Sequence, residues 1–131
     1  MANTVTKRTL IDGPKHAIIH VYLKSDGAAG ELTDEVIVDA STLSPVPTKC
    51  TIEEIWYSFA GFDGMLEFDA TTDTPAWKLV AAQAPSYFCF QPFGGIKDNT
   101  GAGSTGDILL TTAGFTAATD EGTLVIKVRK D

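Results

Sequence analysis

The stretch that most constrains this chain runs from residue 51 to residue 69, because it combines the densest run of aromatic residues with a turn signal. β-branched and aromatic residues dominate its first half, and glycines bracket a turn at 61–64. The return segment 65–69 alternates apolar and polar residues, which is typical of a strand with one buried face. The sequence therefore predicts a β-hairpin here.

A helix is the competing interpretation of the first half of this stretch. Thr51 and Glu54 have the spacing of a helix capping box, and apolar residues recur at helical intervals around them. In a strand, the apolar residues would change sides after Ile52. A β-bulge near Glu53 and Glu54 resolves this conflict, because one extra residue turns the later side chains to the other face. We predict a bulged strand.

Alternating apolar and polar residues predict strands along most of the chain. The clearest covers 15–24, where every second residue from Ala17 to Leu23 is apolar. Prolines interrupt 41–48, which is predicted to cross over between strands, and 92–106 is a long glycine-rich loop. Besides the hairpin, strands are expected at about 4–12, 31–40, 76–81, 86–91, 107–113 and 122–130.

This pattern of eight to nine strands without a convincing helix predicts an all-β fold. The 131 residues, 44% of them hydrophobic, suffice for one domain covering 1–131. Two long connections fit Greek-key linkage better than a plain meander. We predict a two-sheet antiparallel sandwich, jelly-roll-like, in which the first and last strands pair.

The net charge of −7 is unevenly distributed along the chain. Residues 25–73 carry eleven acids against the single base Lys49. Such an acidic body argues against a nucleic-acid partner, which requires clustered lysine and arginine. No apolar run reaches the roughly 18 residues of a membrane span, and the chain start lacks a signal-peptide core. We expect synthesis in a cytoplasm and no membrane partner.

Two cysteines, Cys50 and Cys89, are too few for a disulfide scaffold. We favour two buried free thiols, and a disulfide between them stays open. The two histidines, His16 and His20, would lie on one strand face about 13 Å apart, too far to share a metal. They also lack the HxH spacing of cupin metal sites, which disfavours a cupin-type enzyme. Calcium at loop aspartates is the remaining metal alternative; they are Asp63, Asp69, Asp73, Asp98 and Asp107.

No catalytic residue and no cofactor are predicted. The sequence G-x-G-x-x-G at 101–106 lacks the preceding hydrophobic strand and following helix of a dinucleotide site, so it is interpreted as a connector. Glu53 and Glu54 are expected to face opposite sides of a strand, which excludes a glycosidase pair. Trp56, Trp77 and Tyr57 would suit a sugar-stacking platform, although core packing is the commoner role of aromatics in a sandwich.

Several stretches spread over most of the chain carry a family resemblance: His20–Leu23 with Ser25–Gly27, Glu31–Thr33, Thr51–Tyr57, Phe68–Asp73, Phe93–Asp98 and Thr105–Thr112. Together they resemble a family of small bacteriophage virion proteins best represented among phages of aquatic bacteria. The resemblance implies a structural role in the particle, on head or tail, and brings no catalytic residues.

On this basis we expect a capsid decoration or cement protein, located in the virion. It would bind the major capsid protein or another virion protein, as a homo-oligomer for which a cyclic trimer is one form. The alternatives are a protein associated with the phage tail or fibre, and a carbohydrate-binding β-sandwich module.

Basic residues at the two chain ends are the predicted partner-binding set. Pairing of the terminal strands would gather them on one edge or face, facing an acidic shell, while the acidic loops face solvent. Apolar contacts would supply most of the affinity and charge would set orientation. The set comprises Lys7, Arg8, Lys127, Arg129 and Lys130.

Overall fold

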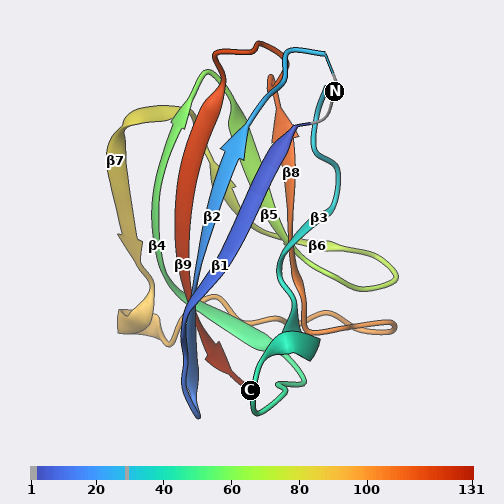
Figure 1. The fold of residues 1–131 in the computed structure, drawn as a ribbon. Coiled ribbons are helices and arrows are strands. Elements are labelled where there is room, and N and C mark those ends of the chain that lie inside the picture. Colours follow the sequence, from blue (N-terminus) through green and yellow to red (C-terminus); the bar gives the residue numbers. More distant parts are fainter. Residues whose placement is uncertain (1–2, 29) are drawn as a thin grey trace.

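The computed structural model describes residues 3–28 and 30–131, and the side chains of all of these except 82 and 83. Nine strands and two short 3₁₀-helices make up the regular structure of these residues (Figure 1). The strands are β1 (Thr4–Asp12), β2 (His16–Lys24), β3 (Glu35–Val38), β4 (Cys50–Ala60), β5 (Asp63–Phe68), β6 (Thr74–Leu79), β7 (Ala82–Cys89), β8 (Ile108–Ala113) and β9 (Glu121–Lys130); the 3₁₀-helices are η1 (Ala40–Thr42) and η2 (Gln91–Phe93).

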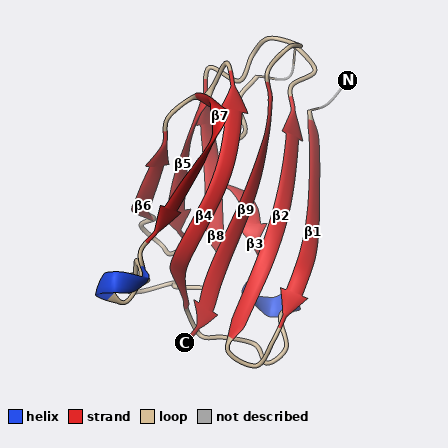
Figure 2. Ribbon diagram, turned by 90° about the vertical axis from the view of Figure 1, so that its left-hand side faces the viewer, coloured by secondary structure: helices blue, strands red, loops and turns tan. Residues whose placement is uncertain are grey.

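The strands form two antiparallel sheets packed face to face (Figure 2). One sheet has the order β1-β2-β9-β4-β7, and the other has the order β3-β8-β5-β6. The predicted all-β, two-sheet, jelly-roll-like antiparallel sandwich is therefore confirmed. No helix among the described residues is long and apolar enough to cross a membrane.

Strict alternation builds the core between the sheets. In β2 every second side chain from Ala17 to Leu23 is buried, as predicted, and the inward side chains of β9 from Leu124 to Val128 are fully buried. Phe59 from β4 stacks on Phe62 with ring centroids 4.5 Å apart. Large buried aromatic and aliphatic side chains from both sheets thus close the interior.

The strand β4 carries the predicted bulge, and the helical interpretation is wrong. Its register against β9 shifts between Ile52 and Glu54. Cys50 and Ile52 are buried before the shift, while Ile55 and the alternate residues after it are buried beyond it. The extra residue keeps apolar side chains on the core face along the whole strand.

The predicted hairpin of 51–69 is wrong, although both of its strands and the turn between them exist. β4 lies in the five-stranded sheet and pairs with β7 and β9, whereas β5 lies in the four-stranded sheet and pairs with β6 and β8. The turn at 61–62 therefore connects the two sheets instead of two paired strands.

Three predicted strand boundaries differ from the structure. The strand expected at 31–40 is only Glu35–Val38, because the backbone of Leu32 bonds instead with the backbone and side chain of Thr112. The strands expected at 76–81 and 86–91 begin earlier, at Thr74 and Ala82. Pro85 argues against a strand in the sequence, so the start of β7 was predicted too late. The proline is tolerated there because β7 is an edge strand.

The prediction that the first and last strands pair is wrong. A tight turn, in which the Gly13 N–H donates to the carbonyl of His16 over 2.8 Å, makes β1 the hairpin partner of β2. The other side of β2 pairs with β9 along its whole length. β1 is left at the border of the sheet, where eight of its nine residues are exposed.

Candidate binding surfaces

The five predicted partner-binding residues do not form one basic patch. Lys7 lies opposite the buried Val21 and pairs with Glu35 at 3.4 Å, whereas Arg8 lies on the outer face of the sheet. Lys127 and Arg129 are also on the outer face, two strands away. Their role in partner binding stays a prediction, but the gathering on one edge does not occur.

Lys130 is the clearest structural member of this set, because its side chain is only 4% exposed. Its ammonium group donates to Asp12 Oδ1 at 2.5 Å, to the Gly13 carbonyl at 2.7 Å and to the Ser44 carbonyl at 2.9 Å. This contact holds the pKa of Asp12 below its ordinary value, with help from the Ser44 N–H. Lys130 therefore fastens the β1–β2 turn to the 41–48 crossover.

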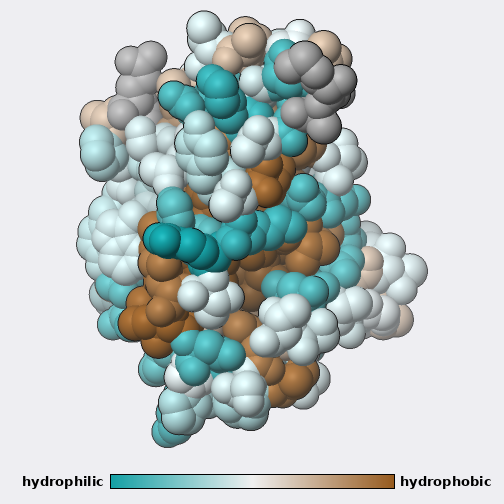
Figure 3. Space-filling model, in the orientation of Figure 1, coloured by the Kyte–Doolittle hydropathy of each residue, from teal (hydrophilic) through white to brown (hydrophobic). Residues whose placement is uncertain are grey.

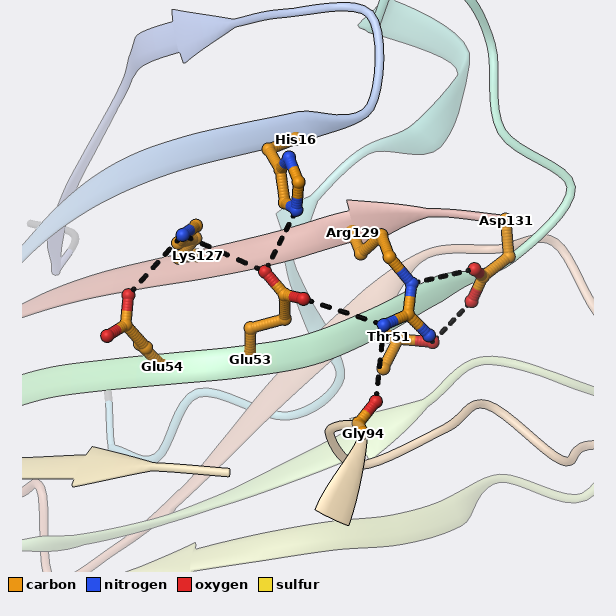
Figure 4. A network of polar contacts seen from close by, with 8 residues as sticks. All are labelled: His16, Thr51, Glu53, Glu54, Gly94, Lys127, Arg129 and Asp131. Atoms are coloured by element: carbon orange, nitrogen blue, oxygen red, sulfur yellow. Dashed lines mark hydrogen bonds and ion pairs between the residues drawn. The ribbon is translucent and has the colours of Figure 1, made fainter. Parts of the chain in front are cut away.

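The two remaining bases of β9 enter an ionic network around Glu53 (Figure 4). The Glu53 carboxylate, 9% exposed, lies 3.1 Å from His16 Nε2, 3.8 Å from Lys127 Nζ and 3.5 Å from Arg129 Nη1. Lys127 also lies 3.6 Å from Glu54. A carboxylate this deeply buried requires such partners, since an unpaired buried charge is costly.

Arg129 continues the network toward the chain end. It pairs with Asp131 at 3.2 Å and donates to the Gly94 carbonyl at 3.3 Å, while the Thr51 hydroxyl donates to Asp131 (Figure 4). The charges of Lys127 and Arg129 are thus compensated within the molecule. Most of the predicted basic residues therefore hold β2, β9, β4 and the 92–106 loop together.

The expectation that Glu53 and Glu54 face opposite sides is wrong. Both lie within 4 Å of Lys127 on the outer face, because the bulge places two successive residues of β4 on the same side. Glu53 is engaged by Lys127, Arg129 and the His16 imidazole, and Glu54 accepts a hydrogen bond from the Tyr87 hydroxyl at 2.5 Å. Neither carboxylate is placed as a member of a catalytic pair.

The two histidines lie on the outer face of β2, as predicted, and have separate partners. His16 faces Glu53, and His20 Nε2 is 2.7 Å from Thr123 Oγ1. Neither histidine belongs to a group of metal-ligating side chains among residues 3–28 and 30–131.

One carboxylate group in the described part of the chain has the spacing of a metal site: Asp34, Glu67 and Asp73, whose ligand atoms lie within 4.8 Å of one another. Partial burial raises the pKa of Glu67, and the neighbouring charges of Asp34 and Asp73 raise it further against a hydrogen bond from Thr111. These oxygens could hold a hard divalent cation. Of the loop aspartates predicted for calcium, only Asp73 is in this group.

The other four predicted calcium aspartates instead fix loops by accepting hydrogen bonds. Asp63 accepts from the Ala81 N–H at 2.6 Å, and Asp107 accepts from the Ala40 N–H at 2.8 Å. Asp69 and Asp98 accept from threonine hydroxyls, those of Thr105 and Thr100.

The three aromatic residues of the predicted sugar platform do not lie together on one surface. Tyr57 is buried, and Trp77 packs on Phe90 with ring centroids 4.8 Å apart, whereas Trp56 is exposed on the outer face. Trp56 stacks instead on Tyr87, with ring centroids 5.1 Å apart. Tyr87 was missed because its pairing opposite Trp56 depends on the register of β4 with β7.

Exposed aliphatic side chains occur near the end of β1 and in the 41–48 crossover, two segments that meet at Asp12 and Ser44. Leu10 is 46% exposed, Ile11 is 54% exposed and Val46 is 64% exposed. A hydrogen bond of 3.0 Å from the Ser44 N–H to Asp12 joins the two segments. Figure 3 shows hydrophobic surface on this side of the molecule, broken by hydrophilic side chains. We call Leu10, Ile11 and Val46 the apolar end.

The two cysteines are both free, which excludes the disulfide left open by the sequence. Cys50 is buried as predicted, but Cys89 is exposed on the edge strand β7. Burial raises the pKa of Cys50 to about 12, and the nearby carboxylates of Asp131 and Asp98 add to the rise.

Comparison with known proteins adds little to this description. No protein-family model matches the chain, and no curated protein matches it. Among solved structures, the chain is similar to a cupin superfamily protein from Desulfitobacterium hafniense, with a TM-score of 0.39 and 9% sequence identity. The match covers 100% of this chain and 82% of that chain. A similarity this low carries no argument about activity or ligands.

Proposed function

We propose that this protein is a structural protein of a bacteriophage particle, and that it decorates and stabilises the outer head shell. The stretches that resemble small phage virion proteins support the proposal. The structural observation that carries it is the apolar end, because exposed aliphatic side chains on neighbouring segments are typical of a protein-binding surface.

The apolar end can supply the affinity that the basic residues cannot. Burying a fully exposed aliphatic side chain contributes about 1.5–3 kcal/mol, so three partly exposed ones contribute a few kcal/mol in total. Exposed ion pairs contribute roughly 0–1 kcal/mol each, and Lys127, Arg129 and Lys130 already have partners. We therefore assign the shell contact to the apolar end, with Arg8 beside it setting orientation. The proposed partner is the major capsid protein, and a closed oligomer such as a trimer would match a symmetry axis of the shell.

Quantitative mass spectrometry of purified particles tests the location. A decoration protein should be present in a copy number comparable to that of the shell subunits. A copy number of only a few per particle would assign the protein to the tail or portal, and its absence from particles would contradict the proposal.

A sedimentation assay with undecorated shells tests the contact. Val46→Asp should weaken binding at least tenfold, because it places a charge in the apolar end. Val80→Asp is the matched control, since Val80 is 59% exposed in the β6–β7 connection and should bind as the wild type does. Equal weakening by both variants would contradict the assignment of the contact.

Carbohydrate binding is the second candidate function, and the exposed Trp56–Tyr87 stack is the observation that favours it. Adjacent aromatic rings on an open sheet face suit stacking against a sugar. Glycan-array binding that Trp56→Ala abolishes without loss of folding would support it. Trp77→Ala is the contrasting variant, because this half-buried ring should cost stability instead, by about 3 kcal/mol.

A further inference from the structure

The strand β1 leaves one border of the five-stranded sheet open. Among the described residues it pairs only with β2, and it contains no proline (Figure 2). An edge strand presents a row of unpaired N–H and C=O groups that another strand can join. The opposite border, β7, contains Pro85, which makes it the poorer acceptor, although both border strands have one register shift.

A groove runs beside this open border, between β1 and the other sheet. Its volume is about 260 Å³, and Lys7, Arg8 and Thr9 form its β1 side. The apolar part of its lining comes from β2, β3 and the segment after it: Ile19, Val36, Ile37 and Leu43. A sixth strand beside β1 would direct alternate side chains toward the inner face of the sheet, over this groove. Aliphatic side chains fit such a lining.

The charge on β1 indicates which polar side chains an added strand should have. Arg8 has no carboxylate within ion-pair distance among the described residues, and it lies at the middle of β1, next to Lys7. Antiparallel pairing with β1 of a second copy, centred on the strand, would place Arg8 opposite Arg8. Like charges directly opposite each other are destabilising, so a second copy is a poor occupant. An occupant with carboxylates on the outer face, opposite Arg8, is favoured, since Lys7 faces inward and already pairs with Glu35.

We propose that β1 accepts an extended segment of another protein, with aliphatic side chains on one face and acidic side chains on the other, as a sixth strand of the sheet. Main-chain hydrogen bonds would supply affinity, and the groove and Arg8 would supply specificity. The inference goes beyond the proposed function and does not depend on it, because any partner with this chemistry fits.

A synthetic peptide tests the proposal on the full chain. The probe is Thr-Val-Glu-Val-Glu-Val-Glu-Val-Thr, and its counterpart has lysine at each glutamate. Amide hydrogen exchange and backbone NMR shifts are measured with each peptide. The glutamate peptide should slow exchange of β1 amides at least tenfold, and it should bind at least tenfold more tightly than the lysine peptide.

Substitutions of Arg8, with a control at Lys97, test the role of charge in this contact. Arg8→Glu should reverse the preference between the peptides, whereas Lys97→Glu, the same change at an exposed lysine of the 92–106 loop, should leave it intact. Arg8→Gln provides the same test in weaker form if Arg8→Glu fails to fold. Unchanged β1 exchange at saturating peptide, shifts confined to another strand, or equal binding of both peptides would each overturn the proposal.

Discussion

Glu67 illustrates at the scale of one residue how partial burial and, to a lesser degree, neighbouring charges set a pH dependence. Its pKa is raised in the folded protein above the ordinary value of 4.5, so the folded state binds more protons than the unfolded state as the pH rises from there. The contribution of Glu67 to stability therefore falls as the pH rises through its raised pKa. The side chain is an unfavourable neighbour for Asp34 and Asp73 at neutral pH.

We predict that Glu67→Gln stabilises the fold at pH 7 by roughly 0.5 kcal/mol, because it removes the repulsion and can still accept from the Thr111 hydroxyl. Below about pH 3 the two proteins should have nearly equal free energies of unfolding, since Glu67 is then protonated in both states. Urea unfolding at both pH values measures this. A loss of stability at pH 7 would show that the carboxylate charge is required there.

The two cysteines should differ sharply in reactivity. Cys89 is exposed, whereas burial raises the pKa of Cys50 to about 12 and keeps its thiol protonated and inaccessible. A thiol reagent at pH 8 should modify one cysteine in the native protein and two in urea. Cys89→Ser should remove the native reaction entirely. Labelling of Cys50 in the folded variant would contradict the burial.

At the scale of the strand, the close packing of β9 on β4 depends on Gly122, which has no side chain. A Cβ atom on Gly122 would lie 2.5 Å from Phe59 Cδ1 and 2.9 Å from the Ser58 carbonyl oxygen. Gly122→Ala should therefore cost about 1–3 kcal/mol of unfolding free energy, measured in urea, because part of the obstacle is backbone. Gly101→Ala is the control, since no atom lies within 4 Å of its added Cβ. A neutral Gly122→Ala would contradict the close packing of β4 on β9.

The strands that the sequence predicts best are those with strict alternation. β2, β9, β4 and β5 all have one apolar face, and even the bulge could be predicted because the apolar residues change sides around Glu53. Their partners could not be predicted in the same way, since β4 and β5 follow each other in the chain but belong to different sheets. The boundaries of β3 and β7 were missed because their ends depend on hydrogen bonds to distant strands and on tolerance of Pro85 at an edge.

The candidate surfaces were harder to predict than the strands, for a physical reason. Which bases are free depends on pairings between residues far apart in sequence, such as Lys130 with Asp12. Likewise, the segments that carry Val46 and Leu10 are neighbours only because the crossover bonds to the end of β1 through Ser44 and Asp12. Charge along the chain predicted a basic region, but tertiary contacts neutralise most of it and leave Arg8.

At the scale of the whole molecule, the sandwich places its proposed contacts close together. The apolar end and the open border of β1 share the strand β1, and the groove beside them is lined from both sheets. A partner that covers the apolar end can therefore extend a segment along β1. The exposed Trp56–Tyr87 stack lies near the opposite border of the same sheet, on β4 and β7.

A density map of the phage particle tests this account most directly. The map should show nine-stranded sandwiches on the outer head shell, with the apolar end of Leu10, Ile11 and Val46 against the shell. A segment of the shell should lie beside β1. A map in which the sandwich is missing from the shell, or is attached through the β7 border with β1 facing solvent, would contradict it.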